Sequence, residues 1–148
     1  MATTALARRY GTEPTRPIVG DAPAPRSLEA IAVENAREGC VRETYGALVA
    51  LWQARHAGDP VVATAMAPIA NDEVRHAELA WEVGRWAELR LSPTARQRVA
   101  SAREQAMAAL RTESLGPVDR SLVAWAGVPS AKSAASLLWE LERIGSIS

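Results

Sequence analysis

The apolar positions between residues 60 and 89 recur at alternating intervals of four and three, which is the spacing of one face of an α-helix. Two adjacent positions of this stripe, Glu73 and His76, are not apolar. Three residues apart on a helix, their side chains lie about 60° from each other on one face. The pattern therefore predicts that both side chains point toward the core. The full stripe reads Val62, Met66, Ile69, Glu73, His76, Ala80, Val83 and Ala87.

A second helical pattern precedes this one, over residues 28–57. Ser27 has the side chain of an N-cap residue, and Gly58 is the kind of residue that follows a helix end. Two stripes run along this helix, and the small residues of the second would let a neighbouring helix approach closely. The first stripe reads Ile31, Glu34, Glu38, Val41, Tyr45, Leu48 and Trp52, and the second reads Val33, Ala36, Cys40, Glu43, Ala47 and Ala50.

The two helical patterns are separated by a turn of about two residues. Asp59 suits the N-cap of the second helix and Pro60 its first position, because a proline there has no backbone hydrogen bond to lose. So short a turn predicts an antiparallel hairpin. Pro68 inside the second helix removes one backbone hydrogen bond and predicts a kink near Thr64.

The remaining sequence predicts an all-α fold with three regions. Residues 1–26 are rich in proline and glycine and predict an extended, disordered arm, either a floppy tail or a peptide that docks on a larger assembly. Residues 27–90 form the helical hairpin. Residues 91–148 form a C-terminal helical region, with helices expected at 93–113, 118–126 and 131–144, the last packing back on the hairpin.

Charge and composition narrow the classes of function. Lys plus Arg and Asp plus Glu each number 17, so the net charge is zero and no basic surface predicts nucleic-acid binding. No apolar run is long enough to predict a membrane span. The single cysteine, Cys40, has no disulfide partner, which fits a reducing compartment and predicts a cytoplasmic protein. Its place in a helical pattern predicts a small buried side chain.

A carboxylate in a core is costly unless a cation compensates it, and a cationic side chain or a metal ion would do so. An internal Glu73–His76 hydrogen bond, or exposure of the stripe at this level, are the alternatives. Glu38 on the preceding helix lies within about 7 Å of the same axial level. Glu43 lies nearer that level but belongs to the other stripe. Two carboxylates and an imidazole suit iron or manganese, and zinc also accepts them.

These residues resemble a motif of the ferritin-like superfamily, which includes the rubrerythrins. One helix of that family offers a Glu with a Tyr seven residues later, as Glu38 and Tyr45 do here, and the next offers Glu-x-x-His, as Glu73 and His76 do. The resemblance implies that Glu38 and His76 are terminal ligands, that Glu73 bridges two metal ions and that Tyr45 hydrogen-bonds around them. Glu43 would be a substitute ligand.

A complete di-iron bundle of this family uses two such helix pairs. The chain has one pair, and its other histidine, His56, is placed at the end of a helix. We therefore expect a homodimer or higher oligomer that shares a di-iron site and oxidises iron, as a ferroxidase-like enzyme would, with O₂ or peroxide. The alternative is a metal-free helical scaffold, or a partner-binding module, that has lost half of the site.

Overall fold

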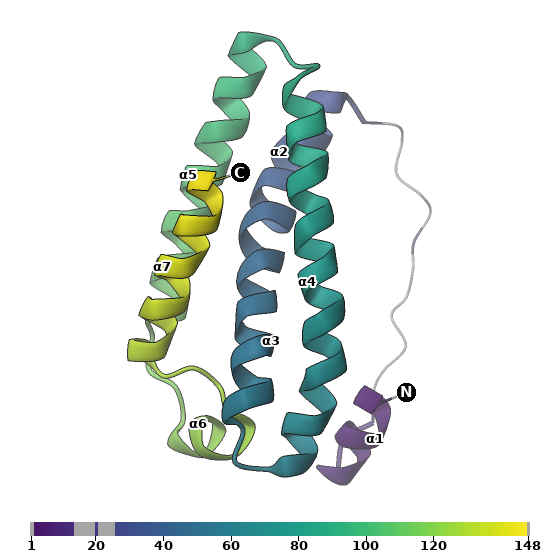
Figure 1. Cartoon of the computed structure of the whole chain (residues 1–148), viewed down its shortest axis with the longest axis vertical. Helices are drawn as coiled ribbons and strands as arrows, with labels where there is room; N and C mark the ends of the chain where they lie inside the picture. Colours follow the sequence, from purple (N-terminus) through teal and green to yellow (C-terminus); the bar gives the residue numbers. More distant parts are fainter. Residues whose placement is uncertain (1, 14–19, 21–25, 148) are drawn as a thin grey trace.

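The computed structural model describes residues 2–13, 20 and 26–147, and within these residues it contains helices and no strand. The predicted all-α class is therefore confirmed. The long helices run side by side along the longest axis of the molecule (Figure 1). None of the helices in the described part of the chain is long and apolar enough to cross a membrane.

The predicted hairpin is present. Its first arm consists of α2 (Leu28–Arg37), a π-helical turn η1 (Glu38–Glu43) and α3 (Thr44–His56), which follow one another as one rod. Its second arm is α4 (Pro60–Glu88), which packs along the whole of the first (Figure 1). The helix α4 continues through Pro68 without interruption.

The π-helical turn was not predicted, because the apolar spacing alone suggests one regular helix. Such a turn accommodates one residue more than an α-helical turn and rotates the faces on its two sides relative to each other. The buried residues of the first arm accordingly follow neither predicted stripe throughout: four of them belong to the small-residue stripe, and Val41 belongs to the first stripe. These buried residues are Ala32, Ala36, Gly39, Cys40, Val41, Thr44, Ala47 and Ala50.

The C-terminal helices cover one side of the hairpin. The helix α5 (Pro93–Ser114) packs on α2, and α7 (Ala131–Ile147) packs on α3 and α5, as the sequence predicts for the last helix. Figure 1 shows α3 between α4 and α7. The short helix α6 (Arg120–Ala126) lies at the end of the molecule that holds the hairpin turn.

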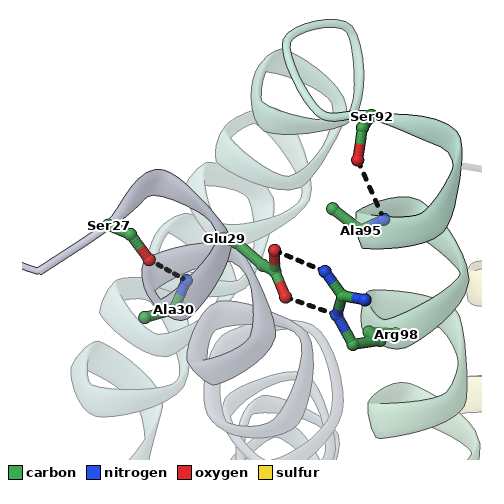
Figure 2. A network of polar contacts seen from close by, with 6 residues as sticks. All are labelled: Ser27, Glu29, Ala30, Ser92, Ala95 and Arg98. Atoms are coloured by element: carbon green, nitrogen blue, oxygen red, sulfur yellow. Dashed lines mark hydrogen bonds and ion pairs between the residues drawn. The ribbon is translucent and has the colours of Figure 1, made fainter.

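Ser27 begins α2 as expected, and Ser92 begins α5 in the same way. The Ser27 hydroxyl accepts a hydrogen bond from the Ala30 N–H, and the Ser92 hydroxyl accepts one from the Ala95 N–H, both at 3.2 Å (Figure 2). Between these two caps, Arg98 of α5 donates two hydrogen bonds to the Glu29 carboxylate of α2 at 2.5 and 2.7 Å. This pair fixes the relative position of α2 and α5 near their first turns.

The core contains two clusters of buried residues, one along α2 and one around η1 in the middle of the first arm. The first joins α2 to α5 and to the end of α4, through Ala32, Ala36, Ala87, Leu91, Ala95 and Val99. The second joins η1 to α5 and α7, through Val41, Ala106, Leu110, Leu138 and Leu141. Alanines are frequent in the first cluster, so its helices pack closely and bury little area per residue.

The N-terminal region differs from the extended arm that its composition predicts. Residues Ala2–Arg9 form a helix, α1, which lies beside the first turns of α4 (Figure 1). Tyr10 donates a hydrogen bond of 2.9 Å to Asp59, and the Arg9 guanidinium lies 3.1 Å from the same carboxylate. Under the alternative that the arm docks on a larger assembly, residues 16–20 are the candidate segment, and of these only Gly20 lies within the described residues.

Candidate functional site

The helix α4 has one side that the other helices cover, and Trp81 marks it. The Trp81 indole N–H donates a hydrogen bond of 3.1 Å to the Thr44 hydroxyl. The Arg103 guanidinium of α5 lies 5.1 Å from the centre of the indole ring. A Cβ atom on Gly145 of α7 would lie 3.3 Å from the same ring. Trp81 is accordingly buried beneath α5 and α7.

The opposite side of α4 is exposed to solvent. Because successive residues of an α-helix are rotated by about 100°, His76, Leu79, Val83 and Trp86 lie about 140–160° from Trp81 around the helix. We call these four residues the uncovered face. The exposed fraction is 57% for Leu79 and 49% for Trp86. Apolar side chains this large and this close together on one helix indicate an interaction surface.

His76 lies on this exposed side and the half-buried Glu73 lies at its edge, so the prediction that both side chains point into the core is wrong. The His76 Nδ1 atom is 3.8 Å from a Glu73 carboxylate oxygen, and the two side chains are 61% and 37% exposed. Around the helix, His76 lies about 40° to one side of the buried Ala80, whereas the buried Ala77 and Trp81 lie about 60° and 100° to the other side. The covered side of α4 is therefore centred beyond Ala80, away from His76.

The two other candidate carboxylates are also exposed. Glu38 and Glu43 lie at the two ends of η1, and Gly39 of this turn packs against Ala80, one turn beyond His76. Within the described residues, no three His, Cys, Asp or Glu side chains are close enough together to hold a metal ion. Within these residues, the candidate ligands of one copy are therefore not gathered into a group of three.

Tyr45 is placed away from the uncovered face. Its half-buried side chain packs on the apolar cluster that joins η1 to α5 and α7. The resemblance implies a hydrogen bond from Tyr45 to the metal ligands, but the structure gives this residue a packing role within one chain.

Cys40 is fully buried, as predicted. Burial raises the pKa of its thiol above the usual value, and the nearby Arg103 charge opposes this shift only in part.

An open cleft of about 530 Å³ lies on the covered side, between α4, α5 and α7. Its floor includes Cys40, Trp81 and Leu141, and charged side chains of α5 and α7 form its rim. Arg111 and Glu142 form an ion pair across this rim. The cleft is on the opposite side of α4 from His76, so it does not contribute to the candidate metal ligands.

Sequence reasoning missed Leu79 and Trp86. They stand three and ten residues after His76, so with Val83 they continue from the histidine at intervals of three and four. The sequence contains this second apolar stripe, but His76 and Val83 also belong to the stripe that includes Ala80 and Ala87. From the sequence alone, both residues are therefore assigned only to that stripe. The helix α4 is thus apolar on two sides, and only one of them is covered by the chain's own helices.

No protein-family model, curated protein or solved structure gives a significant match to this chain.

Proposed function

We propose that the chain is a ferritin-like protein that binds metal ions at a site shared by two copies. One observation carries this proposal: Glu73 and His76 stand side by side on the exposed side of α4, next to the exposed Leu79 and Trp86. Two copies that meet through this side would bring two carboxylates and two imidazoles together. Four such donors suit iron, manganese or zinc.

A two-fold axis makes the contact self-complementary, so each copy supplies the same residues. Glu38 and Glu43 remain candidates for additional carboxylate ligands, since both are exposed and lie at the two ends of η1, which packs on α4. A di-iron centre would require them, because the chain has no further histidine in α4. The resemblance implies that such a centre would supply oxidation of Fe(II) by O₂ or peroxide.

The second candidate function is that of a metal-free pairing module. The exposure of Glu73 and His76 favours it, because in water the pair is hydrated and needs no metal ion to compensate its charge. In this case Leu79 and Trp86 would carry the association alone. Metal binding by the assembled protein separates the two candidates.

The test is metal binding by the full chain under anaerobic conditions, with Fe(II) or Mn(II). We expect wild-type protein to retain metal and His76→Ala to lose it, while helix content stays the same because alanine favours helix. The matched control is His56→Ala, which removes the chain's other imidazole. His56 stacks on Trp52 at the exposed end of α3 and should not affect metal binding.

The ratio of metal to chain tests whether the site is shared. A mononuclear site between two copies predicts one metal ion per two chains, and a di-iron site predicts two per two chains. If wild-type protein retains no more metal than His76→Ala, the metal-binding proposal is wrong and the pairing module is favoured. Equal losses in His56→Ala and His76→Ala would also contradict the proposal.

A further inference from the structure

The helix α4 is nearly symmetric about the candidate metal ligands. It spans Pro60–Glu88, so its midpoint is Val74, which lies between Glu73 and His76. If two copies of α4 cross a two-fold axis at this level in antiparallel directions, the helices overlap along their whole length. A parallel arrangement with a two-fold axis would also superpose the ligands, but it would place the exposed Trp86 side chains against each other.

The antiparallel arrangement brings different residues to the same level. Trp86 lies ten residues after His76, and Ala63 lies ten residues before Glu73. Both distances are about 15 Å along the helix. Trp86 of one copy therefore reaches the level of Ala63 in the second copy, which is the part of α4 that α1 flanks.

This part of α4 contains an apolar hollow of about 630 Å³. Val61, Ala65 and Pro68 lie on the same side of α4 as Trp86, since they are about 140–160° from Trp81 around the helix. The helix α1 forms the other wall. The lining residues are Ala5, Arg9, Pro60, Val61, Thr64, Ala65 and Pro68.

The exposed Trp86 side chain is contacted by Arg90, which restricts its motion. The Arg90 guanidinium lies 4.5 Å from the centre of the indole ring and also donates a hydrogen bond of 2.9 Å to the Trp86 carbonyl oxygen. A large aromatic side chain with restricted freedom is the typical anchor of a protein interface, because little conformational entropy is lost when it is buried.

We propose that Trp86 of each copy inserts into the hollow between α1 and α4 of a second copy, and that these two contacts set the antiparallel register of the shared metal site. The inference rests on the proposed pairing of two copies. It adds that Trp86 anchors the pair and that the hollow between α1 and α4 receives this side chain. It also gives α1 a role, since this helix completes the wall of the hollow.

Cross-linking tests the register. In the antiparallel arrangement Ala65 of one copy faces Val83 of the other, because they lie eight residues before Glu73 and seven after His76. Within one chain these positions are about 27 Å apart along the helix, well beyond the Cα separation of about 7 Å that a disulfide allows. Oxidised Ala65→Cys/Val83→Cys protein should therefore become a covalent dimer.

The control is Ala65→Cys/Glu82→Cys, which moves one cysteine by a single residue and about 100° away from the uncovered face. It should remain uncross-linked. Both proteins keep the buried Cys40, so its contribution is the same in each. Equal cross-linking of the two proteins, or none in either while the wild type is dimeric, would overturn the proposed register.

A truncation variant tests the anchor. We expect Trp86→Ala to raise the dimer dissociation constant at least about tenfold, as the loss of an interface anchor does. Trp139→Ala, which removes an exposed indole from α7, should leave it unchanged. A dimeric wild type in which Trp86→Ala has no effect overturns this inference alone. A wild type that is monomeric with metal present overturns the proposed pairing itself.

Discussion

The Thr44 hydroxyl joins the two arms of the hairpin inside the core. It donates a hydrogen bond to the Gly39 carbonyl oxygen at 3.3 Å and accepts one from the Trp81 indole at 3.1 Å. The first bond closes the π-helical turn, and the second fixes the ring that α5 and α7 cover. One buried hydroxyl therefore links the irregular turn to the orientation of α4.

Thr44→Val keeps the shape of this side chain and removes both hydrogen bonds. We expect a loss of about 1–3 kcal/mol in the free energy of unfolding, because the buried Trp81 N–H is left without a partner. Urea denaturation followed by circular dichroism measures the change. Thr112→Val is the control, since its hydroxyl donates to the Ala108 carbonyl on an exposed surface, and its effect should be much smaller.

Glu29 gives the contact between α2 and α5 a dependence on pH. The hydrogen bonds from Arg98 hold the pKa of the Glu29 carboxyl below its usual value of 4.5. A carboxyl with a lowered pKa in the folded state stabilises the protein above its unfolded pKa. That contribution is lost as the pH falls through the folded value.

We therefore expect the free energy of unfolding of Glu29→Gln to fall less steeply with decreasing pH below about pH 4.5 than that of the wild type. The reason is that the substituted protein takes up no proton at this site. Urea midpoints from neutral to acidic pH measure the slope. The double variant Glu29→Gln/Arg98→Gln should follow the same curve as Glu29→Gln. A wild type and a Glu29→Gln variant with parallel curves would contradict this account.

At the scale of single residues, the sequence predicts which side chains lie close together better than it predicts whether they point into the core. The Glu73–His76 proximity follows from three-residue spacing on a helix and is confirmed at 3.8 Å. The direction of His76 depends on a rotation of a few tens of degrees around α4, because His76 lies about 40° to one side of the buried Ala80 and the buried Ala77 lies about 60° to the other. A periodic pattern that names either His76 or Ala77 as the core residue cannot resolve that difference.

Among the elements, α6 shows how a short helix is held in place. The Gly58 and Asp59 N–H groups each donate a hydrogen bond of 3.0 Å to a carbonyl oxygen of α6, those of Ala124 and Trp125. A Cβ atom on Gly58 would lie 2.3 Å from the Ala124 oxygen, so the glycine permits this contact. The sequence predicts a glycine here as a helix end, but its close approach to α6 is a tertiary feature.

We expect Gly58→Ala to separate α6 from the hairpin turn, with a loss of about 1–3 kcal/mol from overpacking against backbone. Faster hydrogen exchange at the Gly127 and Val128 end of α6 would accompany it. Gly46→Ala is the control on α3, where an added Cβ meets nothing within 4 Å. This control should stabilise the protein by about 0.5–1 kcal/mol, since alanine favours helix.

The boundaries of the helices were largely predictable, because local side chains define them. Ser27, Asp59 and Ser92 accept hydrogen bonds from the first turns of their helices, and Pro60 and Pro93 occupy first helical positions. The π-helical turn has no comparable local signal. Gly39 of this turn lies against Ala80, a residue 41 positions away, and an added Cβ would come 2.6 Å from the Ala80 Cβ.

For the whole molecule, the distribution of helices is asymmetric. The helices α5 and α7 cover the side of the hairpin that holds Trp81, and the side that holds His76, Leu79 and Trp86 stays exposed. The resemblance based on Glu38, Tyr45, Glu73 and His76 predicts half of a bundle, and the proposed pairing would place the second half on this exposed side.

Association through the uncovered face predicts that thermal stability depends on protein concentration. A dimer that dissociates on unfolding gains about 1.4 kcal/mol per tenfold rise in chain concentration, so the midpoint of thermal unfolding should increase with concentration. Mn(II) should raise the midpoint further if it binds only the folded dimer. Differential scanning calorimetry over a hundredfold range of concentration measures both effects.

Two variants assign these effects to their causes. Trp86→Ala should remove most of the concentration dependence, because it lowers the population of dimer before unfolding begins. His76→Ala should keep the concentration dependence and lose the response to Mn(II), because the apolar contacts of Leu79 and Trp86 remain. A midpoint that is independent of concentration in the wild type would show that the exposed side of α4 does not pair two copies of this chain.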